Sequence, residues 1–308
     1  MYTDKTIVVT GGLGHIGSKL IRSLERTSEI RIVDNLATQR YPSLFDLPKE
    51  PRVRFFEEDV LNADLENIFK GADIVIHLAA ITNAEETVGK EAETEAVNFE
   101  GLKRVADACA TVGARLIFPS TTSVYGSQEE VVDETCEDLK PQSPYAESKL
   151  KAEEYLVSKK DVLKFVTCRF GTIFGYSPGM RFHTAVNKFI WQAVNGKEIS
   201  VWKTAWEQKR PYLDLDDCIR SINFIIEQDL FDGEIYNVVT KNFPVKDIVE
   251  TIQTFVPSLK VAYVDSKIMN QLSYDVRADK IAAKGFTPSG DLKKGIGGTI
   301  EKLQAIRV

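Results

Sequence analysis

The sequence is poor in the residues that build metal centres and disulfide frameworks. It contains four cysteines and three histidines in 308 residues. No two cysteines form a C-x-x-C pair, and His15, His77 and His183 lie far apart in the chain. We therefore expect neither a metal site nor a disulfide framework, and free thiols are typical of a reducing compartment.

Long apolar runs and an excess of positive charge are missing as well. No apolar stretch approaches the roughly 20 residues that a membrane helix needs, and the first residues, MYTDKTIVV, lack a signal-peptide pattern. The formal net charge is -6, whereas nucleic-acid-binding domains are more often basic. These features predict a cytoplasmic protein with no nucleic-acid partner and no membrane partner.

What the chain does contain is an alternation of short apolar runs with helical patterns. The apolar runs lie at 6–10, 29–35, 53–60, 72–80, 114–120 and 163–170, and the helical patterns include 15–26, 91–113 and 143–159. Short apolar runs between helices indicate parallel strands that are covered on both faces. The expected fold class is therefore α/β, with a doubly wound parallel sheet of the Rossmann type.

The rhythm of the sequence changes after about residue 172, where the elements become shorter and turns more frequent. We expect residues 1–172 to form a dinucleotide-binding domain, completed by a return segment at about 208–239. Residues 173–207 and 240–308 are expected to form a smaller C-terminal cap that binds the substrate. No linker of Gly and Ser separates the two parts, so the cap is expected to pack on the sheet.

A glycine-rich loop joins the first apolar run to the first helical pattern. It reads TGGLGHIG and contains Gly11, Gly12, Gly14 and Gly17. Such a loop permits a tight turn and brings a pyrophosphate close to bare backbone at a helix N-terminus. Asp34 ends the second apolar run, where a carboxylate can bind ribose hydroxyls and repel a 2′-phosphate. These residues predict that the cofactor is NAD.

A tyrosine and a lysine four residues apart occur three times, as Tyr145/Lys149, Tyr155/Lys159 and Tyr263/Lys267. Residues at this spacing share one face of a helix, and an ammonium group beside a phenol lowers the pKa of the phenol. The context favours the first pair, because Ser143 and Pro144 precede it as a predicted N-cap and first-turn proline. Tyr145 also follows the end of the fifth apolar run, and strand ends carry the chemistry of α/β sheets.

These motifs occur together in the order typical of one large enzyme family. They are TGGLGHIG, Asp34, EEDV with Asp59, HLAA, Asn98, STTSVYG, YAESK and CRFGTIFG. In this respect the chain resembles the extended short-chain dehydrogenases/reductases, and among them the nucleotide-sugar epimerases and dehydratases. The resemblance covers nearly the whole chain.

The resemblance implies a role for particular residues. It makes Tyr145 the catalytic acid and base, Lys149 its cofactor-bound partner, and Thr121 the residue that hydrogen-bonds the reacting hydroxyl. The implied NAD contacts are Gly11, Gly14, His15, Ile16, Gly17, Asp34, Asn35, Asp59, Val60, Leu78, Ala79, Ala80, Asn98, Tyr145 and Lys149. The implied contacts with a nucleotide-diphosphate sugar are Thr82, Thr121, Thr122, Thr172, Arg181, Arg210 and Arg277. For Arg210 and Arg277, a surface arginine is the alternative interpretation.

The two residues that follow Thr121 limit which reactions the chain is expected to catalyse. Relatives that act as 4,6-dehydratases carry Asp-Glu there, whereas this chain has Thr122 and Ser123, which offer no acid or base of suitable pKa. The interpretation is a nucleotide-sugar epimerase that inverts C4 through a transient 4-keto sugar. A dehydrogenase/reductase or a decarboxylase on the same fold, and an NAD(H)-binding sensor without turnover, remain as alternatives. The resemblance also implies a homodimer formed by the helices around 91–112 and 143–160.

Overall fold

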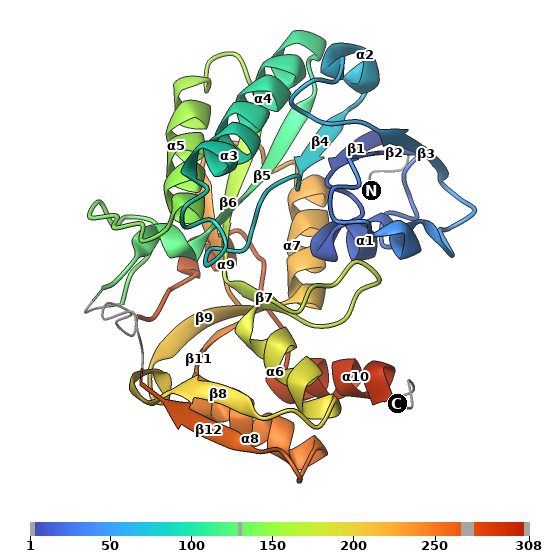
Figure 1. The fold of residues 1–308 in the computed structure, drawn as a ribbon. Coiled ribbons are helices and arrows are strands. Elements are labelled where there is room, and N and C mark those ends of the chain that lie inside the picture. Colours follow the sequence, from blue (N-terminus) through green and yellow to red (C-terminus); the bar gives the residue numbers. More distant parts are fainter. Residues whose placement is uncertain (1–3, 129–130, 266–273, 305–308) are drawn as a thin grey trace.

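A seven-stranded parallel sheet forms the larger domain (Figure 1). The computed structural model describes residues 4–128, 131–265 and 274–304. The strand order is β10-β6-β5-β4-β1-β2-β3, and every pairing in this sheet is parallel. Its strands are β1 (Thr6–Thr10), β2 (Glu29–Asp34), β3 (Arg52–Glu57), β4 (Ile74–His77), β5 (Arg115–Thr121), β6 (Phe165–Phe170) and β10 (Ile235–Val238). The predicted doubly wound parallel sheet is confirmed.

Helices cover both faces of this sheet because successive residues of its strands point to opposite sides. In β1, Ile7 and Val9 join one apolar core, whereas Val8 joins the other. The first core is closed by α1 (His15–Ile21), α7 (Leu215–Glu227) and α9 (Asp279–Ala283). The second core is closed by α2 (Leu65–Phe69), α4 (Gly101–Val112) and α5 (Pro144–Ser158). Strands buried on both faces explain the unbroken apolar runs of the sequence.

The helix predicted at 91–113 is interrupted. It consists of α3 (Glu91–Glu95), a π-helical turn η2 (Ala96–Glu100) and α4. The wider turn holds Asn98, whose side chain is buried. Its amide donates to the carbonyl of Ile81 at 3.0 Å and to Oγ of Ser148 at 3.1 Å, and its Oδ1 accepts from the N–H of Ile81 at 2.8 Å. π-Turns of this kind often occur at functional sites.

The described residues of the cap form two small sheets and three helices. The sheets are β11-β9-β7 and β12-β8, formed by β7 (Thr172–Phe174), β9 (Lys209–Asp214), β11 (Lys241–Pro244), β8 (Ile199–Trp202) and β12 (Val261–Val264). The helices are α6 (Ala185–Val194), α8 (Val245–Phe255) and α10 (Leu292–Gln304). Short 3₁₀ turns lie at η1 (Tyr41–Leu44), η3 (Thr122–Tyr125) and η4 (Lys203–Ala205). The cap has an apolar core of its own.

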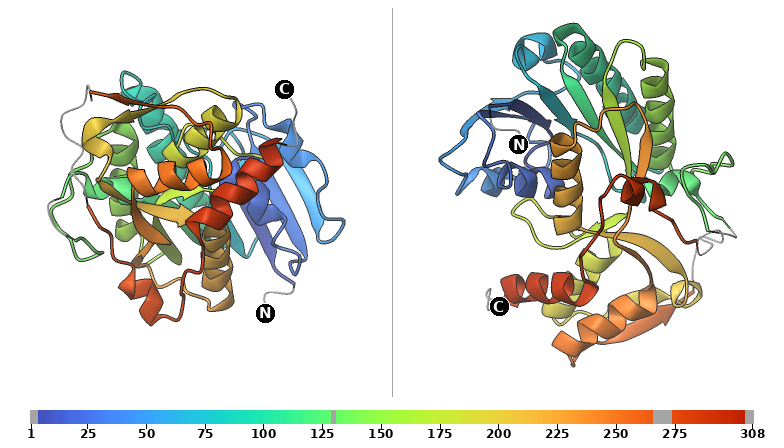
Figure 2. Two further views of the ribbon diagram at one scale, coloured as in Figure 1. Left: turned by 90° about the horizontal axis from the view of Figure 1, so that it is seen from below. Right: turned by 180° about the vertical axis from the view of Figure 1, so that it is seen from behind.

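The chain crosses between the two parts several times, as the two views in Figure 2 show. The predicted return segment at about 208–239 contains β9, which belongs to the smaller three-stranded sheet, and then α7 and β10, which belong to the larger domain. The later helix α9 also packs with the larger domain, through Ile281. Pairing between distant strands decides these memberships, and no local sequence pattern reports it.

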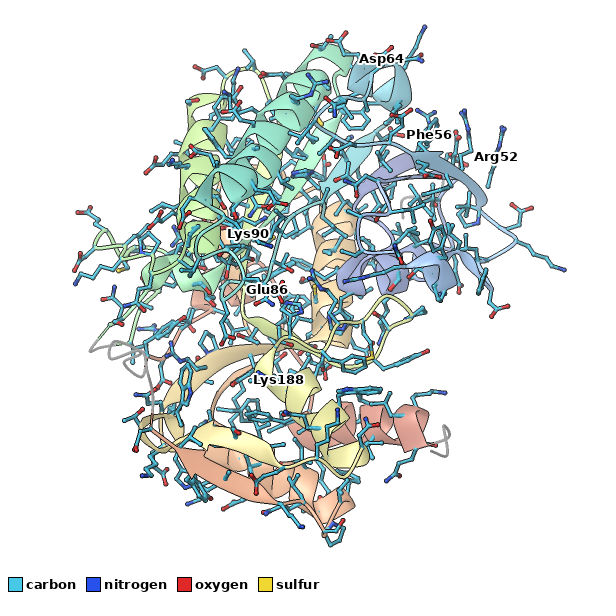
Figure 3. All side chains as sticks on the ribbon, in the orientation of Figure 1. Arg52, Phe56, Asp64, Glu86, Lys90 and Lys188 are labelled. Carbon is cyan, nitrogen blue, oxygen red and sulfur yellow. The ribbon has the colours of Figure 1, made fainter. Side chains whose placement is uncertain are left out.

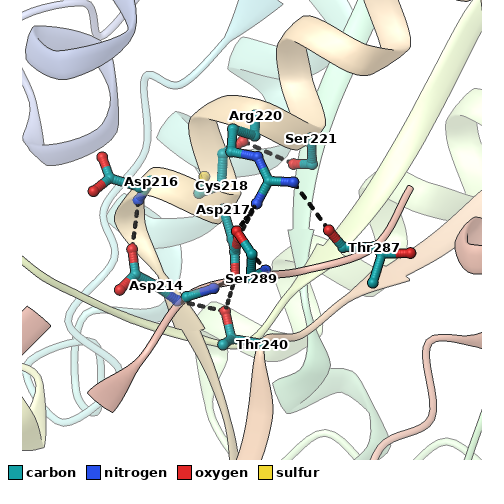
Figure 4. A network of polar contacts seen from close by, with 10 residues as sticks. Asp214, Asp216, Asp217, Cys218, Arg220, Ser221, Thr240, Thr287 and Ser289 are labelled. Carbon is teal, nitrogen blue, oxygen red and sulfur yellow. Dashed lines mark hydrogen bonds and ion pairs between the residues drawn. The ribbon is translucent and has the colours of Figure 1, made fainter. Parts of the chain in front are cut away.

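Asp217 anchors one of these crossings (Figure 4). Its side chain lies in α7 and is 1% exposed. Its carboxylate accepts hydrogen bonds from Nη1 of Arg220 (2.6 Å), Oγ1 of Thr240 (2.7 Å), and the N–H groups of Ser289 and Gly290 (both 2.9 Å). The segment that leads into α10 is therefore tied to a helix of the larger domain.

Two other kinds of feature are absent from the part of the chain that the structure describes. Within 4–128, 131–265 and 274–304, no helix combines the length and the apolar character needed to cross a bilayer. In the same ranges, no three His, Cys, Asp or Glu side chains are grouped so that they could hold a metal ion.

Candidate active site

A cavity of about 1010 Å³ lies between the carboxyl ends of the parallel strands and the cap. Its wall includes the loop after β1, the end of β2, the segments after β4 and β5, and residues of α6 and β9. In Figure 3, Glu86 from the segment after β4 and Lys188 from α6 lie where the domain and the cap face each other. Pockets for one small ligand commonly occupy about 300–1,000 Å³, so this cavity has room for an extended dinucleotide and part of a second ligand.

The glycine loop is packed so closely that side chains are excluded. Gly11 has φ +64°, and a Cβ there would lie 2.5 Å from the backbone nitrogen of Ala79. A Cβ at Gly17 would lie 2.5 Å from the carbonyl oxygen of Gly12, where α1 meets the loop. Gly14 is the N-cap of α1 and supplies no side chain to the free N–H groups of the first turn. Bare backbone beside an uncapped helix start suits a diphosphate.

Asp34 and Asp59 line the neighbouring part of the cavity. Oδ2 of Asp34 accepts from the N–H of Leu13 at 3.1 Å, and Oδ1 accepts from the N–H of Leu36 at 3.0 Å. Each carboxylate oxygen has a second lone pair available for a ribose hydroxyl. Asn35 donates to Oδ2 of Asp59 at 2.9 Å, which fixes the two loops relative to each other. The geometry fits the adenosine half of a dinucleotide.

Most of the predicted cofactor contacts meet at this cavity. Its wall contains Gly11, Gly14, His15, Ile16, Gly17, Asp34, Asn35, Asp59, Val60, Leu78, Ala79, Ala80, Tyr145 and Lys149. Asn98 differs, because it is 1% exposed and does not belong to the wall. Its hydrogen bonds brace the segment after β4 from behind, so its effect on a ligand is indirect.

Thr121 and Tyr145 lie close together on the wall of the cavity, near enough for Thr121 to affect the pKa of the phenol. Thr121 is the last residue of β5, and its Oγ1 accepts from the N–H of Ser123 at 3.1 Å. Tyr145 lies in the first turn of α5, where Ser143 is the N-cap and accepts from the N–H of Ala146 at 3.2 Å. The predicted cap at Ser143, with Pro144 in the first turn, is confirmed. The helix start thus places the phenol against the end of the strand.

The electrostatics of Tyr145 differ from the prediction. Burial raises the pKa of its phenol to about 12, and the hydrogen bond from Thr121 offsets this only in part. Lys149 does not lower this pKa as expected, because its Nζ donates to the carbonyl of Pro119 at 2.8 Å and lies over the ring of Phe118 at 4.6 Å. Burial lowers the pKa of Lys149 itself to about 7.

The other two tyrosine–lysine pairs lie elsewhere. Tyr155 and Lys159 both bind the carboxylate of Asp107 at the surface between α4 and α5. Tyr263 belongs to β12 in the cap, where its ring packs edge-on against Trp206, and Lys267 lies outside the described residues. Neither tyrosine lines the cavity.

The predicted substrate contacts divide into two groups. Thr82, Thr121, Thr172, Arg181 and Arg210 line the cavity, whereas Thr122 and Arg277 do not. Thr122 is 3% exposed, and its Oγ1 donates to the carbonyl of Phe170 at 3.3 Å. The guanidinium of Arg277 forms an exposed ion pair with Asp279. The geometry therefore gives no support for a substrate contact by either residue.

Comparison with known proteins identifies the family. Residues 7–238 match the model of the "NAD dependent epimerase/dehydratase family". The chain belongs to this family. Its cofactor is accordingly NAD, and the glycine loop with Asp34 would hold it. When bound, NAD supplies a hydride acceptor and, in its oxidised form, a positive charge.

Relatives of this epimerase/dehydratase-family protein include enzymes named for different reactions. It is 28% identical over 317 residues to an uncharacterized UDP-glucose epimerase, YtcB, of Bacillus subtilis, with 97% of this chain and 98% of that protein covered. It is 26% identical to the dTDP-D-glucose 4,6-dehydratase of Bos taurus, with 96% and 88% covered. A solved structure of UDP-N-acetylglucosamine 4-epimerase from Methanobrevibacter ruminantium, in complex with UDP-N-acetylmuramic acid, is 26% identical with a TM-score of 0.87, and 97% and 99% are covered.

Some residues of this family member reach the cavity without a signal in the sequence. They include Arg40 and Lys188. Nη1 of Arg40 donates to the carbonyl of Gly179 at 2.6 Å, and burial together with nearby Arg181 lowers the pKa of Arg40 to about 10. Arg40 follows the second strand in a segment without a motif, and only the tertiary fold brings it to the glycine loop.

A segment of the cap, residues 175–181, lies across the glycine loop and is called the strap here. Nε2 of His15 donates to the carbonyl of Gly175 at 2.8 Å, and Oγ of Ser177 donates to the carbonyl of His15 at 2.8 Å. The N–H of Gly179 donates to Oγ of Ser18 at 3.0 Å. Any side chain at Gly179 would collide with the backbone of the glycine loop. The cap is therefore bonded directly to the predicted cofactor loop.

Proposed function

We propose that this protein is an NAD-dependent epimerase that inverts C4 of a nucleoside-diphosphate sugar. The observation that carries the proposal is the position of Thr121 and Tyr145 close together on the cavity wall, with no carboxylate at the two positions after Thr121. In the family that the chain resembles, the members that remove water carry an acid and a base directly after the residue that corresponds to Thr121. With a threonine and a serine at these two positions, the site has no side chain suited to removing water. The reactions that remain open to it are oxidation and reduction at one carbon of the sugar.

In the proposed reaction, the chain's own residues move one proton and orient one hydroxyl. Oγ1 of Thr121 and the phenol oxygen of Tyr145 bind the C4 hydroxyl of the sugar. Tyr145 accepts the proton of that hydroxyl and later returns it to the same oxygen, and bound NAD would take up the C4 hydride and give it back to the other face of the sugar. Atoms and electrons balance over the cycle, because the product is an isomer and NAD is regenerated.

A phenol with a pKa of about 12 is a weak proton acceptor at neutral pH. The proposal therefore requires positive charge near Tyr145 at the moment of transfer, as the oxidised cofactor and protonated Lys149 would provide. If Tyr145 accepts a proton only while oxidised cofactor is bound, the reaction suits an enzyme that keeps its NAD from one turnover to the next. It also predicts that Tyr145 ionises more readily in the holoenzyme than without cofactor.

Arg210 is the proposed anchor for the substrate diphosphate. It lies in β9 on the cavity wall, and its guanidinium is stacked over the ring of Tyr274 at 5.3 Å. An aromatic ring beneath a guanidinium fixes the plane of the guanidinium, and a planar guanidinium matches two phosphate oxygens in a forked arrangement. Thr172, Thr82 and Arg181 lie on the same wall and are the proposed contacts for the sugar.

The test is conversion of nucleotide sugars by the purified holoenzyme. A panel of UDP-, GDP-, dTDP- and CDP-sugars is incubated with the protein, and the products are measured by mass spectrometry and NMR. The proposal predicts a product of unchanged mass with inverted C4. A product lighter by two hydrogens would mean a dehydrogenase, and one lighter by a water would mean a dehydratase. No conversion of any sugar would favour an NAD(H) sensor.

A further inference from the structure

A buried ion pair lies behind the catalytic pair. Glu153 in α5 is 2% exposed and Arg169 in β6 is 3% exposed. Nε of Arg169 donates to Oε1 of Glu153 at 3.0 Å, and Nη2 donates to Oε2 at 2.7 Å. A buried ion pair commonly contributes no more stability than apolar residues of the same volume. Stability alone therefore does not explain why two charges occupy this core position.

Glu153 is linked to both elements that carry the catalytic residues. Oγ of Ser120 donates to Oε1 of Glu153 at 2.5 Å, and Ser120 immediately precedes Thr121 in β5. Along α5, Tyr145, Lys149 and Glu153 follow one another at intervals of four residues, so they lie on one face of the helix. The carboxylate of Glu153 thus contacts the strand that carries Thr121, and Glu153 lies one helical turn after Lys149.

Arg169 is in turn held from its other side. Its guanidinium lies 4.8 Å from the centre of the Tyr125 ring, in a cation–π arrangement. The hydroxyl of Tyr125 donates to Oδ1 of Asn237 at 2.9 Å, and Asn237 is fully buried in β10. The pair is therefore fixed by three neighbouring strands and the turn after β5. None of Glu153, Arg169 and Asn237 lines the cavity.

We propose that Glu153 is a positioning residue that, held by Arg169, keeps Lys149 protonated and fixes the end of β5 so that Thr121 meets Tyr145. Glu153 reaches neither substrate nor cofactor and acts only through these neighbours. The inference rests on the proposed roles of Thr121, Tyr145 and Lys149.

The charges around Lys149 support this role. Burial lowers the pKa of Lys149 to about 7, and the Glu153 carboxylate acts in the opposite direction. His77 faces Lys149 from β4, but burial and Lys149 itself lower the pKa of His77 to about 3, so its ring is neutral. From α5, Tyr145 adds a neutral phenol. From β5, Lys149 contacts the ring of Phe118 and the carbonyl of Pro119, neither of which carries a charge. Among these groups, Glu153 is the one negative charge that favours the ammonium form.

The decisive comparison is between Glu153→Gln and Glu154→Gln. The second variant makes the same change at the next residue, which is exposed on the outer face of α5. The titration of Lys149 is followed by NMR of the holoenzyme with ¹⁵N-labelled lysine side chains. In Glu153→Gln we expect the Lys149 midpoint at lower pH, and the alkaline fall in kcat moves with it. At a pH above both midpoints, kcat is then lower by about tenfold for each unit of the shift. The KM for the sugar stays near that of the unaltered protein.

Two further variants separate positioning from folding. Glu153→Gln leaves Arg169 buried without its partner and could unfold the protein, so Glu153→Gln/Arg169→Met removes both charges. This double variant is expected to fold and still to show the lowered Lys149 midpoint. Ser120→Ala breaks only the link to β5, so it should lower kcat without moving the pH profile.

Two outcomes would overturn the inference. One is a Lys149 midpoint in Glu153→Gln and in the double variant equal to that in Glu154→Gln. The other is a kcat profile in the double variant that matches the unaltered protein. If the unaltered protein converts no nucleotide sugar, the proposed function fails by itself, and the lysine titration still decides whether Glu153 keeps Lys149 protonated.

Discussion

Replacing Asp217 by asparagine tests whether the anchor between the cap and α7 contributes to stability as its geometry indicates. The buried carboxylate accepts four hydrogen bonds, from Arg220, Thr240, Ser289 and Gly290. An asparagine amide has a single oxygen, and its NH₂ group would face donors. At least two of the four donors therefore lose their acceptor.

The expected loss follows from the strength of these bonds. A hydrogen bond to a charged group contributes about 1.5–3 kcal/mol, so losing two lowers the free energy of unfolding by about 3–6 kcal/mol. For a chain of this size, such a loss lowers Tm by roughly 5–9 °C. Urea unfolding and calorimetry measure both quantities. Because the anchor holds residues 289–290, limited proteolysis should also cleave near them in the variant first.

Asp216→Asn is the matched control. Asp216 is the preceding residue, its side chain is 66% exposed, and it forms an ion pair with Lys19. Exposed pairs contribute about 0–1 kcal/mol, so this variant should remain close to the unaltered protein. If Asp217→Asn loses no more stability than Asp216→Asn, the assignment of the anchor is wrong.

Three further predictions concern the catalytic base, the glycine loop and acid stability. Tyr145→Phe should lower turnover by at least about 100-fold with unchanged NAD binding and Tm, and turnover that persists would rule out the phenol as the base. Gly17→Ala places a Cβ 2.5 Å from the carbonyl of Gly12, so the variant should purify with little NAD; full occupancy by absorbance would contradict the packing. Burial lowers the pKa of His15 to about 4 and of His77 to about 3. Unfolding then takes up protons below about pH 6.5, and the free energy of unfolding falls with falling pH by up to about 1.4 kcal/mol per pH unit for each ring. In urea titrations His15→Asn should show a shallower acid slope, and an equal slope would exclude His15 as a source.

The predicted homodimer is tested separately by sedimentation. The helices expected to form it carry ion pairs on their exposed surface, such as Lys151 with Glu95 and Lys159 with Asp107. Sedimentation equilibrium at low and high salt should give the mass of a dimer. A monomer at all concentrations would show that this charged surface faces water.

Local patterns predicted the strands and the positions of many cavity residues. Apolar runs such as 72–80 mark strands buried on both faces, and residues at the ends of parallel strands meet at one edge of the sheet. Gly11, Asp34 and Thr121 come together at the cavity for this reason. The sequence positions of their strands were enough to predict that meeting.

Features that depend on distant pairing could not be predicted. Arg40 is held beside the glycine loop by a hydrogen bond to the carbonyl of Gly179, 139 residues away. Thr122 lies next to Thr121, but the 3₁₀ turn after β5 directs its hydroxyl to Phe170.

The pKa of Tyr145 was mispredicted because burial outweighs a neighbouring charge, and burial cannot be judged from a spacing of four residues.

The strap has a consequence for how the cofactor is exchanged. Its hydrogen bonds join the cap to His15 and Ser18, beside the loop that would hold the NAD diphosphate. Release of the dinucleotide then waits for these bonds to open, so its residence time is set by motion of the cap. In the proposed reaction, a keto sugar that escaped before the hydride returned would leave reduced cofactor bound behind the strap. After such a failed cycle, a fraction of the protein would be inactive with reduced cofactor bound. This fraction would regain activity only as fast as the strap opens.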